Sequence, residues 1–248
     1  MKTVAIVQSN YIPWKGYFDL IASADEFILY DDVQYTQGDW RNRNRIKTPQ
    51  GLHWLTVPVK VTGRRGQLIR EAEIEGPYWA KDHWQTLAHN YRRAPFFAEI
   101  EPELRAFYLD GQYCRLSDLN RTLIAWAMRK IGITTLLSSS SDYQLDGDRT
   151  MRLVNLCLQA GAEEYISGPA ARSYLDERLF ERKGIKVRWF DYGNYGVYPQ
   201  LWGEFEHGVS VLDLLFNTGP SAYLYLKSGA RCRPAATPAP QRPGGDHA

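Results

Sequence analysis

The chain has 248 residues, of which 44% are hydrophobic and 23% charged, and its formal net charge is +2. The length suits one large α/β domain, the composition excludes a disordered or fibrous chain, and the near-neutral charge gives no support to a protein that coats nucleic acid. No stretch approaches the roughly 20 apolar residues that span a bilayer, and three cysteines without a CxxC pair indicate a reduced, cytoplasmic protein.

The N-terminal part of the chain alternates between strand-like and helical segments. Its first predicted elements are a strand over residues 4–8, a short helix over 15–24 and a second strand over 27–30. A hairpin insertion is expected at about 40–70, because Thr48-Pro49-Gln50-Gly51 is a turn sequence between two strand-like arms. The second arm contains Pro58, which has no N–H to donate, so we expect it at the edge of its sheet.

The remainder of the chain repeats one order of elements. Residues 78–131 are predicted to be helical, and three helical stretches end at a glycine that is followed by an apolar run, at 133–137, 165–166 and 185–190. Helix, glycine and strand in succession imply crossover connections. We therefore predict an α/β fold over 1–227, with a mainly parallel, doubly wound sheet covered by helices. The segment 228–248, rich in Pro and Ala, is predicted to be a disordered tail.

Polar residues that follow the predicted strands are the candidates for a binding site, because ligands of open parallel sheets lie beyond the carboxyl ends of the strands. The candidates for substrate binding at these ends are Gln8, Asn10, Tyr11, Trp14, Gln34, Ser167, Gly168, Arg172 and Tyr174. Tyr11 and Trp14 could stack on a base or a sugar face. The alternative for Trp14 is packing beneath the sheet, and strand ends are polar loops in any case.

Asp31 and Asp32 follow the second predicted strand and are candidates for acid/base or metal chemistry. Adjacent residues at a strand end point to opposite sides, so one carboxylate is expected to face the site. There, Mg²⁺ bridged to a substrate phosphate is the natural ligand. The alternative is a turn carboxylate that accepts backbone N–H bonds. His83 is a candidate general base, although a histidine on a helix surface is the commoner outcome.

The segment Trp40-Arg41-Asn42-Arg43-Asn44-Arg45 alternates arginine with asparagine. Arginines at every second position of an extended segment share one face, where they could clamp a phosphate while tryptophans stack on a base. The candidates for substrate binding in this region are Trp40, Asn42, Arg43, Asn44, Lys47 and Trp54. Residues 16–40 carry acids but no Lys or Arg, and 41–70 carry bases but no acid. These two segments could hold a phosphate and a cation together, or be solvated faces that pair with each other.

Several segments share specific residues with a known family. They are 8–18 (QSNYIPWKGYF), 31–35 (DDVQY), 42–47 (NRNRIK), 54–59 (WLTVPV), 165–168 (YISG), 174–175 (YL), 198–200 (YPQ) and 210–215 (SVLDLL). Together they resemble the WbqC-like family, from the first strand to about residue 220. Ser9 stands where that family usually has proline.

The resemblance implies a biosynthetic role, since members of the family occur among genes for O-antigen, other surface polysaccharides and natural products. The implied reaction is transfer of an acyl or aminoacyl group to an amino group of a sugar, which can be nucleotide-activated, or of a small metabolite. The donor would be aminoacyl-tRNA, acyl-CoA or an adenylate. The resemblance implies no catalytic residue.

A second, more distant similarity concerns the fold. The run from Tyr11 to Ile28 is similar in layout to the first unit of the nucleotidyltransferase and class I aminoacyl-tRNA synthetase (HUP-like) fold, which implies a nucleotide-shaped pocket. The histidines at the helix start of that unit are absent here, which argues against adenylate-forming chemistry. Two alternatives to the acyl transferase are a Mg-dependent nucleotidyl- or phosphoryl-transfer enzyme using Asp31 or Asp32, and a non-catalytic module that binds RNA or a protein partner.

Overall fold

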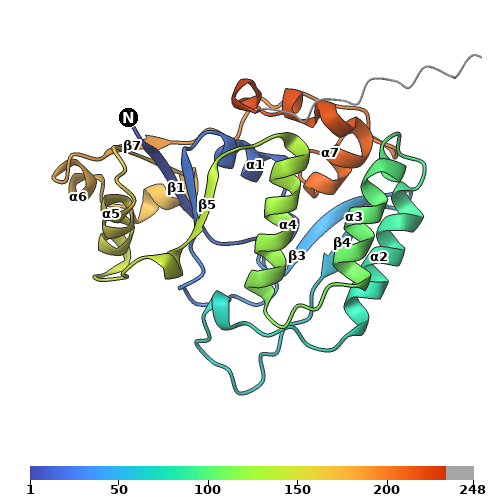
Figure 1. Ribbon diagram of the computed structural model, residues 1–248, viewed down its shortest axis with the longest axis horizontal. Coiled ribbons are helices and arrows are strands. Elements are labelled where there is room, and N and C mark those ends of the chain that lie inside the picture. The colour runs from blue at the N-terminus through green and yellow to red at the C-terminus, as the bar shows by residue number, and fades with distance from the viewer. Residues whose placement is uncertain (233–248) are drawn as a thin grey trace, which may run out of the picture.

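The computed structural model describes residues 1–232 and contains a five-stranded parallel sheet together with a separate antiparallel hairpin (Figure 1). The sheet consists of β1 (Thr3–Val7), β2 (Glu26–Leu29), β5 (Leu136–Ser139), β6 (Glu164–Ser167) and β7 (Lys186–Trp189). The order across the sheet is β5-β2-β1-β6-β7, and every neighbouring pair is parallel. The prediction of a mixed α/β protein with a mainly parallel sheet is therefore confirmed.

Six of the seven α-helices in the described residues lie in connections between strands, and the seventh follows the last strand. The helices are α1 (Lys15–Ala22), α2 (Tyr78–Tyr91), α3 (Phe97–Leu109), α4 (Leu116–Ile131), α5 (Arg149–Gln159), α6 (Glu177–Glu181) and α7 (Val211–Thr218). Short 3-10 helices are η1 (Ile69–Glu71), η2 (Ser140–Asp142), η3 (Pro169–Ser173), η4 (Gly219–Tyr225) and η5 (Gly229–Arg231). No helix within residues 1–232 combines the length and the apolar character needed to cross a membrane.

Both faces of the sheet are covered, because alternate residues of each strand point to opposite sides. Ala5 of β1 belongs to a hydrophobic core that includes residues of α1, α4 and α7. Val4 and Ile6 belong to a second core with residues of α5 and α6, such as Leu153 and Phe180. Strands buried on both faces explain why β1 reads as an unbroken apolar run.

The third strand of the sheet begins later than the sequence predicts. The helix α4 ends at Gly132, which adopts a left-handed conformation with φ of 85°. The N–H of Ile133 then returns to the carbonyl of Met128 at 2.8 Å. Ile133 therefore belongs to the end of the helix, and β5 begins only at Leu136. For this reason the observed strand, Leu136–Ser139, lies further along the chain than the predicted strand over 133–137.

The hairpin consists of β3 (Arg43–Thr48) and β4 (Gly51–Thr56), as the turn sequence predicts. It is separate from the sheet and lies on the side of the molecule that holds α2 and α3 (Figure 1). Its strand β4 ends before Pro58 rather than reaching residue 59.

Residues 228–232, predicted to begin a disordered tail, pack against the domain instead. Arg231 pairs with Asp25 at 2.7 Å, and Cys232 is buried. The rest of the predicted tail, 233–248, lies outside the described residues.

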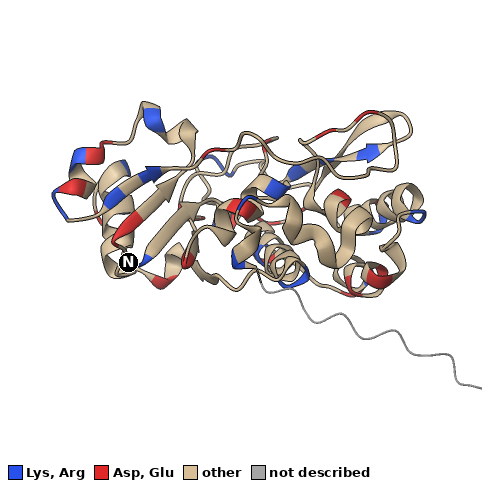
Figure 2. Ribbon diagram, turned by 90° about the horizontal axis from the view of Figure 1, so that it is seen from above, with Lys and Arg blue, Asp and Glu red and all other residues tan. Residues whose placement is uncertain are grey.

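Acidic and basic positions are interspersed along the molecule (Figure 2). Within this distribution, Arg70 pairs with Asp32, and Arg41 pairs with Asp39 at 3.1 Å. Both ion pairs join the acidic segment 16–40 to the basic segment 41–70. The two segments thus neutralise each other in part, which is the alternative that the sequence left open.

Candidate functional site

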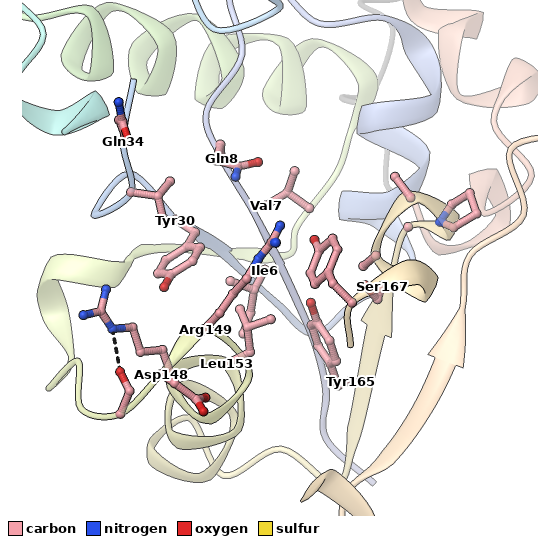
Figure 3. A pocket seen from close by; sticks show the side chains of 18 of the residues that line it. Ile6, Val7, Gln8, Tyr30, Gln34, Asp148, Arg149, Leu153, Tyr165 and Ser167 are labelled. Carbon is pink, nitrogen blue, oxygen red and sulfur yellow. Dashed lines mark hydrogen bonds between the residues drawn. The ribbon is translucent and has the colours of Figure 1, made fainter. Parts of the chain in front are cut away.

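A cavity of about 1010 Å³ opens at the carboxyl edge of the sheet (Figure 3). It is lined by residues at the ends of β1, β2 and β6 and by the start of α5. The strand order reverses between β1 and β6, because the chain leaves β1 toward β2 on one side and later returns to β6 on the other. In open parallel sheets this reversal leaves a crevice in which ligands bind.

Two arginines at the start of α5, Arg149 and Arg152, line this cavity. The guanidinium of Arg149 lies 3.5 Å from the centre of the Tyr174 ring, and Nε of Arg152 donates to the carbonyl of Gly147 at 3.0 Å. Neither arginine takes part in any ion pair found among residues 1–232.

The acid next to these arginines is engaged elsewhere. The Asp148 carboxylate accepts the N–H of Met151 at 3.0 Å and so caps its own helix. Two guanidinium groups without a paired carboxylate give the cavity a net positive charge, which favours an anionic ligand.

Aromatic and neutral polar side chains form the other walls. Tyr30 lies beyond β2, Tyr165 on β6 and Tyr192 after β7, while Gln8 and Ser167 stand at the ends of β1 and β6 (Figure 3). Burial raises the pKa of Tyr30 and Tyr165, and it raises the pKa of Tyr192 to about 12. These hydroxyls therefore stay protonated at neutral pH and can donate hydrogen bonds, while the rings offer apolar faces.

Part of the predicted site is found together in the cavity. The predicted residues that line it are Gln8, Gln34, Ser167, Gly168 and Tyr174. Arg172 does not line the cavity. It lies in η3, and its guanidinium is 5.1 Å from the centre of the Trp189 ring. The sequence analysis missed Arg149 and Arg152. A signal for them exists, since an N-cap aspartate at 148 precedes two bases on one helical turn.

The paired aspartates do not line the cavity. Asp31 is buried, accepts the N–H of Ser9 at 2.8 Å and has a pKa that burial raises. Asp32 accepts the hydroxyl of Ser140 at 2.7 Å and pairs with Arg70. Asp31 is thus the turn carboxylate of the alternative interpretation, and the prediction of a carboxylate facing the site was wrong.

A magnesium ion does not fit these carboxylates. Oδ1 of Asp31 and both carboxylate oxygens of Asp32 are engaged by donors of the protein itself. Within residues 1–232 there is also no cluster of three or more His, Cys, Asp or Glu side chains placed to hold a metal ion. We assign no step to a metal at Asp31 or Asp32.

His83 and Tyr11 are buried and bind other side chains of the protein. Hydrogen bonds join the Tyr11 hydroxyl to Nδ1 of His83 at 2.8 Å and to the Tyr108 hydroxyl at 2.6 Å. His83 is only 7% exposed, and burial lowers its pKa to about 4, against a smaller opposite effect of a hydrogen bond with the Thr56 backbone. This neutral chain joins α2, α3 and the first loop, so its role is to hold the fold together.

The buried His83 predicts a stability that depends on pH. Its pKa is about 4 in the folded protein against 6.5 for a free histidine, so the unfolded chain binds more protons between these values. The free energy of unfolding should therefore fall by about 3 kcal/mol as pH decreases from 6.5 to 4. Urea denaturation across this range, compared with His83→Gln, would measure the effect. His89→Gln, at an exposed position of the same helix, should retain the full dependence; equal slopes for all three proteins would contradict the account.

The polar residues of β3 divide between its two faces. Asn44 donates to the carbonyl of Ile12 at 2.8 Å, and just before the strand Asn42 donates to that of Val57 at 2.8 Å. Lys47 donates to Oε1 of Gln200 at 2.8 Å. All three predicted ligand-binding side chains are buried and bind the protein itself. The alternation of arginine and asparagine between two faces was predicted correctly. The asparagines, however, face the interior and not a ligand site on the surface.

Two exposed tryptophans and two half-buried arginines of the hairpin region form a second cluster, which we call the Trp–Arg face (Trp40, Arg43, Arg45 and Trp54). The two tryptophan rings are 5.5 Å apart, and the Arg43 guanidinium lies 4.4 Å from the centre of the Trp54 ring. Asn10 and Trp14, also predicted to bind substrate, line a hollow of about 310 Å³ beside this face. The predicted single site is therefore divided between the cavity, the Trp–Arg face and the interior.

The fold and the cavity together define an α/β protein with a crevice at the carboxyl edge of a parallel sheet. The family model described as the WbqC-like protein family matches residues 8–225, so the chain belongs to this family. The uncharacterized protein Rv1507c of Mycobacterium tuberculosis is 60% identical over 227 residues, which cover 92% of this chain and 98% of that protein. No solved structure matches the chain.

Proposed function

We propose that this protein is a cytoplasmic biosynthetic transferase that binds a phosphorylated, nucleotide-linked substrate in the cavity beside β1 and β6. The observation that carries the proposal is the pair of guanidinium groups, of Arg149 and Arg152, that line the cavity without a carboxylate partner. Arginine is the side chain best suited to recognise phosphate oxygens. The strand order, reversed at β1, supports a nucleotidyltransferase-like (HUP-like) fold for the same site.

The cavity walls suit the rest of such a substrate. The rings of Tyr30 and Tyr192 offer faces for a base or a sugar, and Gln8 and Ser167 offer hydrogen bonds to hydroxyl groups. We assign the phosphates to Arg149 and Arg152.

The proposed reaction is acyl or aminoacyl transfer to an amino group of the bound sugar or metabolite, in the synthesis of a surface polysaccharide or natural product. The described residues that line the cavity include no Cys, Lys or His. The protein therefore contributes binding and orientation, and the amine attacks the carbonyl of a donor that arrives already activated. The new C–N bond replaces the bond to the leaving group, which departs as an alcohol, thiol or phosphate with the proton of the amine.

An assay with defined donors tests this function. Purified protein is incubated with a uridine diphosphate amino sugar together with one donor at a time: aminoacyl-tRNA, an acyl-CoA or an acyl adenylate. The mass of the sugar nucleotide is then measured by mass spectrometry. We expect one donor to add its acyl mass, and the Arg149→Gln, Arg152→Gln double variant to lose the product. If no compound produces a mass increase and none changes the melting temperature, the proposal is rejected.

A further inference from the structure

The Trp–Arg face carries features that the cavity does not explain. Trp40 and Trp54 are 44% and 41% exposed, which is unusual for large aromatic side chains. They come from different segments, since Trp40 precedes the hairpin and Trp54 lies on β4 opposite Arg45. Their position side by side on the outer face of the hairpin is therefore a product of the fold.

Both arginines of this face are held over the tryptophan rings. The guanidinium of Arg43 lies 4.4 Å from the centre of Trp54, and that of Arg45 lies 5.6 Å from Trp54 and 5.9 Å from Trp40. Arg45 also donates to the carbonyl of Gly208 at 3.0 Å, which fixes its direction. The arginines and tryptophans thus form one cluster of cation–π contacts around two rings that are tilted by 37° to each other.

The positive charge of the Trp–Arg face is not neutralised by a nearby carboxylate. Asp39, the acid beside it, is paired with Arg41 at 3.1 Å. No ion pair found within residues 1–232 includes Arg43 or Arg45. The Nε atoms of both arginines are buried and have no hydrogen-bond partner in that part of the chain. Two oriented guanidinium groups are therefore available to an anion.

The face adjoins two hollows that share Trp40 and Arg45. One, of about 310 Å³, is lined by Asn10, whose buried Oδ1 has no hydrogen-bond partner among the described residues. The other, of about 360 Å³, lies between Trp40, Arg43 and Trp54. Two exposed aromatic rings, an unpartnered amide oxygen and two guanidinium groups outside any ion pair of the described residues are thus gathered around two adjacent hollows.

We infer that the Trp–Arg face is a second binding site, which takes a nucleotide unit, that is, a planar base together with its phosphate. A base can stack on the exposed ring of Trp40 or Trp54, as in single-strand binding proteins, and the arginines take the phosphate. A sugar phosphate uses the charges but leaves the exposed rings without a planar partner. The nucleotide can be free or can be the unpaired end of an RNA strand, because both present the same chemistry.

This second site is next to the cavity but separate from it. The ring of Trp14, which lines the 310 Å³ hollow, lies 5.6 Å from the ring of Tyr192, which lines the cavity. Gln8 lines the cavity and Asn10 the hollow, two residues further along the same loop. The inference does not depend on the proposed transfer reaction, and variants at each place separate the two.

Calorimetric titration of the full-length protein tests the inference with three probes: adenosine monophosphate, a single-stranded RNA hexamer and ribose 5-phosphate. We expect the hexamer or the mononucleotide to bind with a Kd that rises at least tenfold in Trp54→Leu and in Arg43→Gln, as the loss of one stacked base or one phosphate contact predicts. Affinity should fall with salt. Arg172→Gln, at an exposed arginine that lines neither the cavity nor the two hollows, should leave this Kd within twofold.

Each outcome of the titration decides a specific point. Equal affinities for the two nucleotide probes indicate a free nucleotide, and a much tighter hexamer indicates a strand end; both support the site. Binding that is absent, unchanged in Trp54→Leu and Arg43→Gln, or weakened equally in Arg172→Gln overturns it. Ribose 5-phosphate binding as tightly as the mononucleotide overturns the role of the base. Near-ultraviolet circular dichroism of each variant verifies the fold.

Discussion

Replacing Arg149 with glutamine is expected to weaken the binding of a uridine diphosphate amino sugar by roughly 10- to 150-fold. This corresponds to about 1.5–3 kcal/mol, the contribution of a hydrogen bond to a charged group. The guanidinium of Arg149 lies over Tyr174 at the cavity wall and has no ion pair among the described residues, so its removal should leave the fold intact. Isothermal titration at fixed ionic strength measures the change.

Arg172 supplies a matched control for this substitution. It also follows a strand of the sheet and is exposed, but its guanidinium lies over Trp189, outside the cavity lining. Arg172→Gln should therefore bind the sugar nucleotide as the native protein does. Equal weakening by both substitutions would indicate a general electrostatic effect and would contradict the assignment of Arg149 to the phosphates.

The largest expected effect on stability comes from Asp213→Ala. The Asp213 carboxylate is fully buried in α7 and accepts hydrogen bonds from Tyr91 at 2.8 Å, Tyr198 at 2.9 Å and Gln200 at 2.8 Å. Alanine would leave these buried donors without their acceptor. We expect the free energy of unfolding to fall by about 3–5 kcal/mol, the cost of disrupting a buried polar network.

Urea denaturation of Asp213→Ala, with Asp191→Ala as the control, measures this effect. Asp191 also accepts hydrogen bonds, from the Gly193 N–H at 2.9 Å and from Lys227, but its side chain is largely exposed. Its removal should change stability little. If the two variants unfold at similar urea concentrations, the network around Asp213 does not stabilise the protein as described.

The same network explains part of the family's sequence pattern. Tyr198, Gln200 and Asp213 all lie in segments that carry the resemblance to the WbqC-like family, and here they bind one another rather than a ligand. Lys47, from a further such segment, donates to Gln200. These contacts hold the segment before α7 against the hairpin, which gives the residues a structural role in this chain.

The strands and helices were largely readable from the sequence because their signals are local. The apolar run of β1 and the glycine that ends α4 each act through neighbouring residues. Residues at strand ends, such as Gln8 and Ser167, were correctly placed near one another because parallel strands end at a common edge. Local patterns therefore predicted the part of the cavity that the sheet itself builds.

The remaining site residues depend on contacts that no local pattern specifies. The period of two in β3 placed Arg43 and Arg45 on one face, but only the packing of Asn44 against Ile12 shows that this face is outside. Asp31 is engaged by Ser9, which precedes it by 22 residues. Arg149 reaches the cavity because β5 lies at one edge of the sheet and α5 must cross back to β6. The strand order that brings this about cannot be read from the sequence.

A crystal structure of the protein soaked with a uridine diphosphate amino sugar is the most direct test of the central claim, that the crevice between β1 and β6 holds the substrate. We predict phosphate density within hydrogen-bonding distance of the Arg149 and Arg152 guanidinium groups, with the base or sugar against Tyr30 or Tyr192. Well-defined ligand density elsewhere on the protein, with the crevice filled only by water, would contradict it.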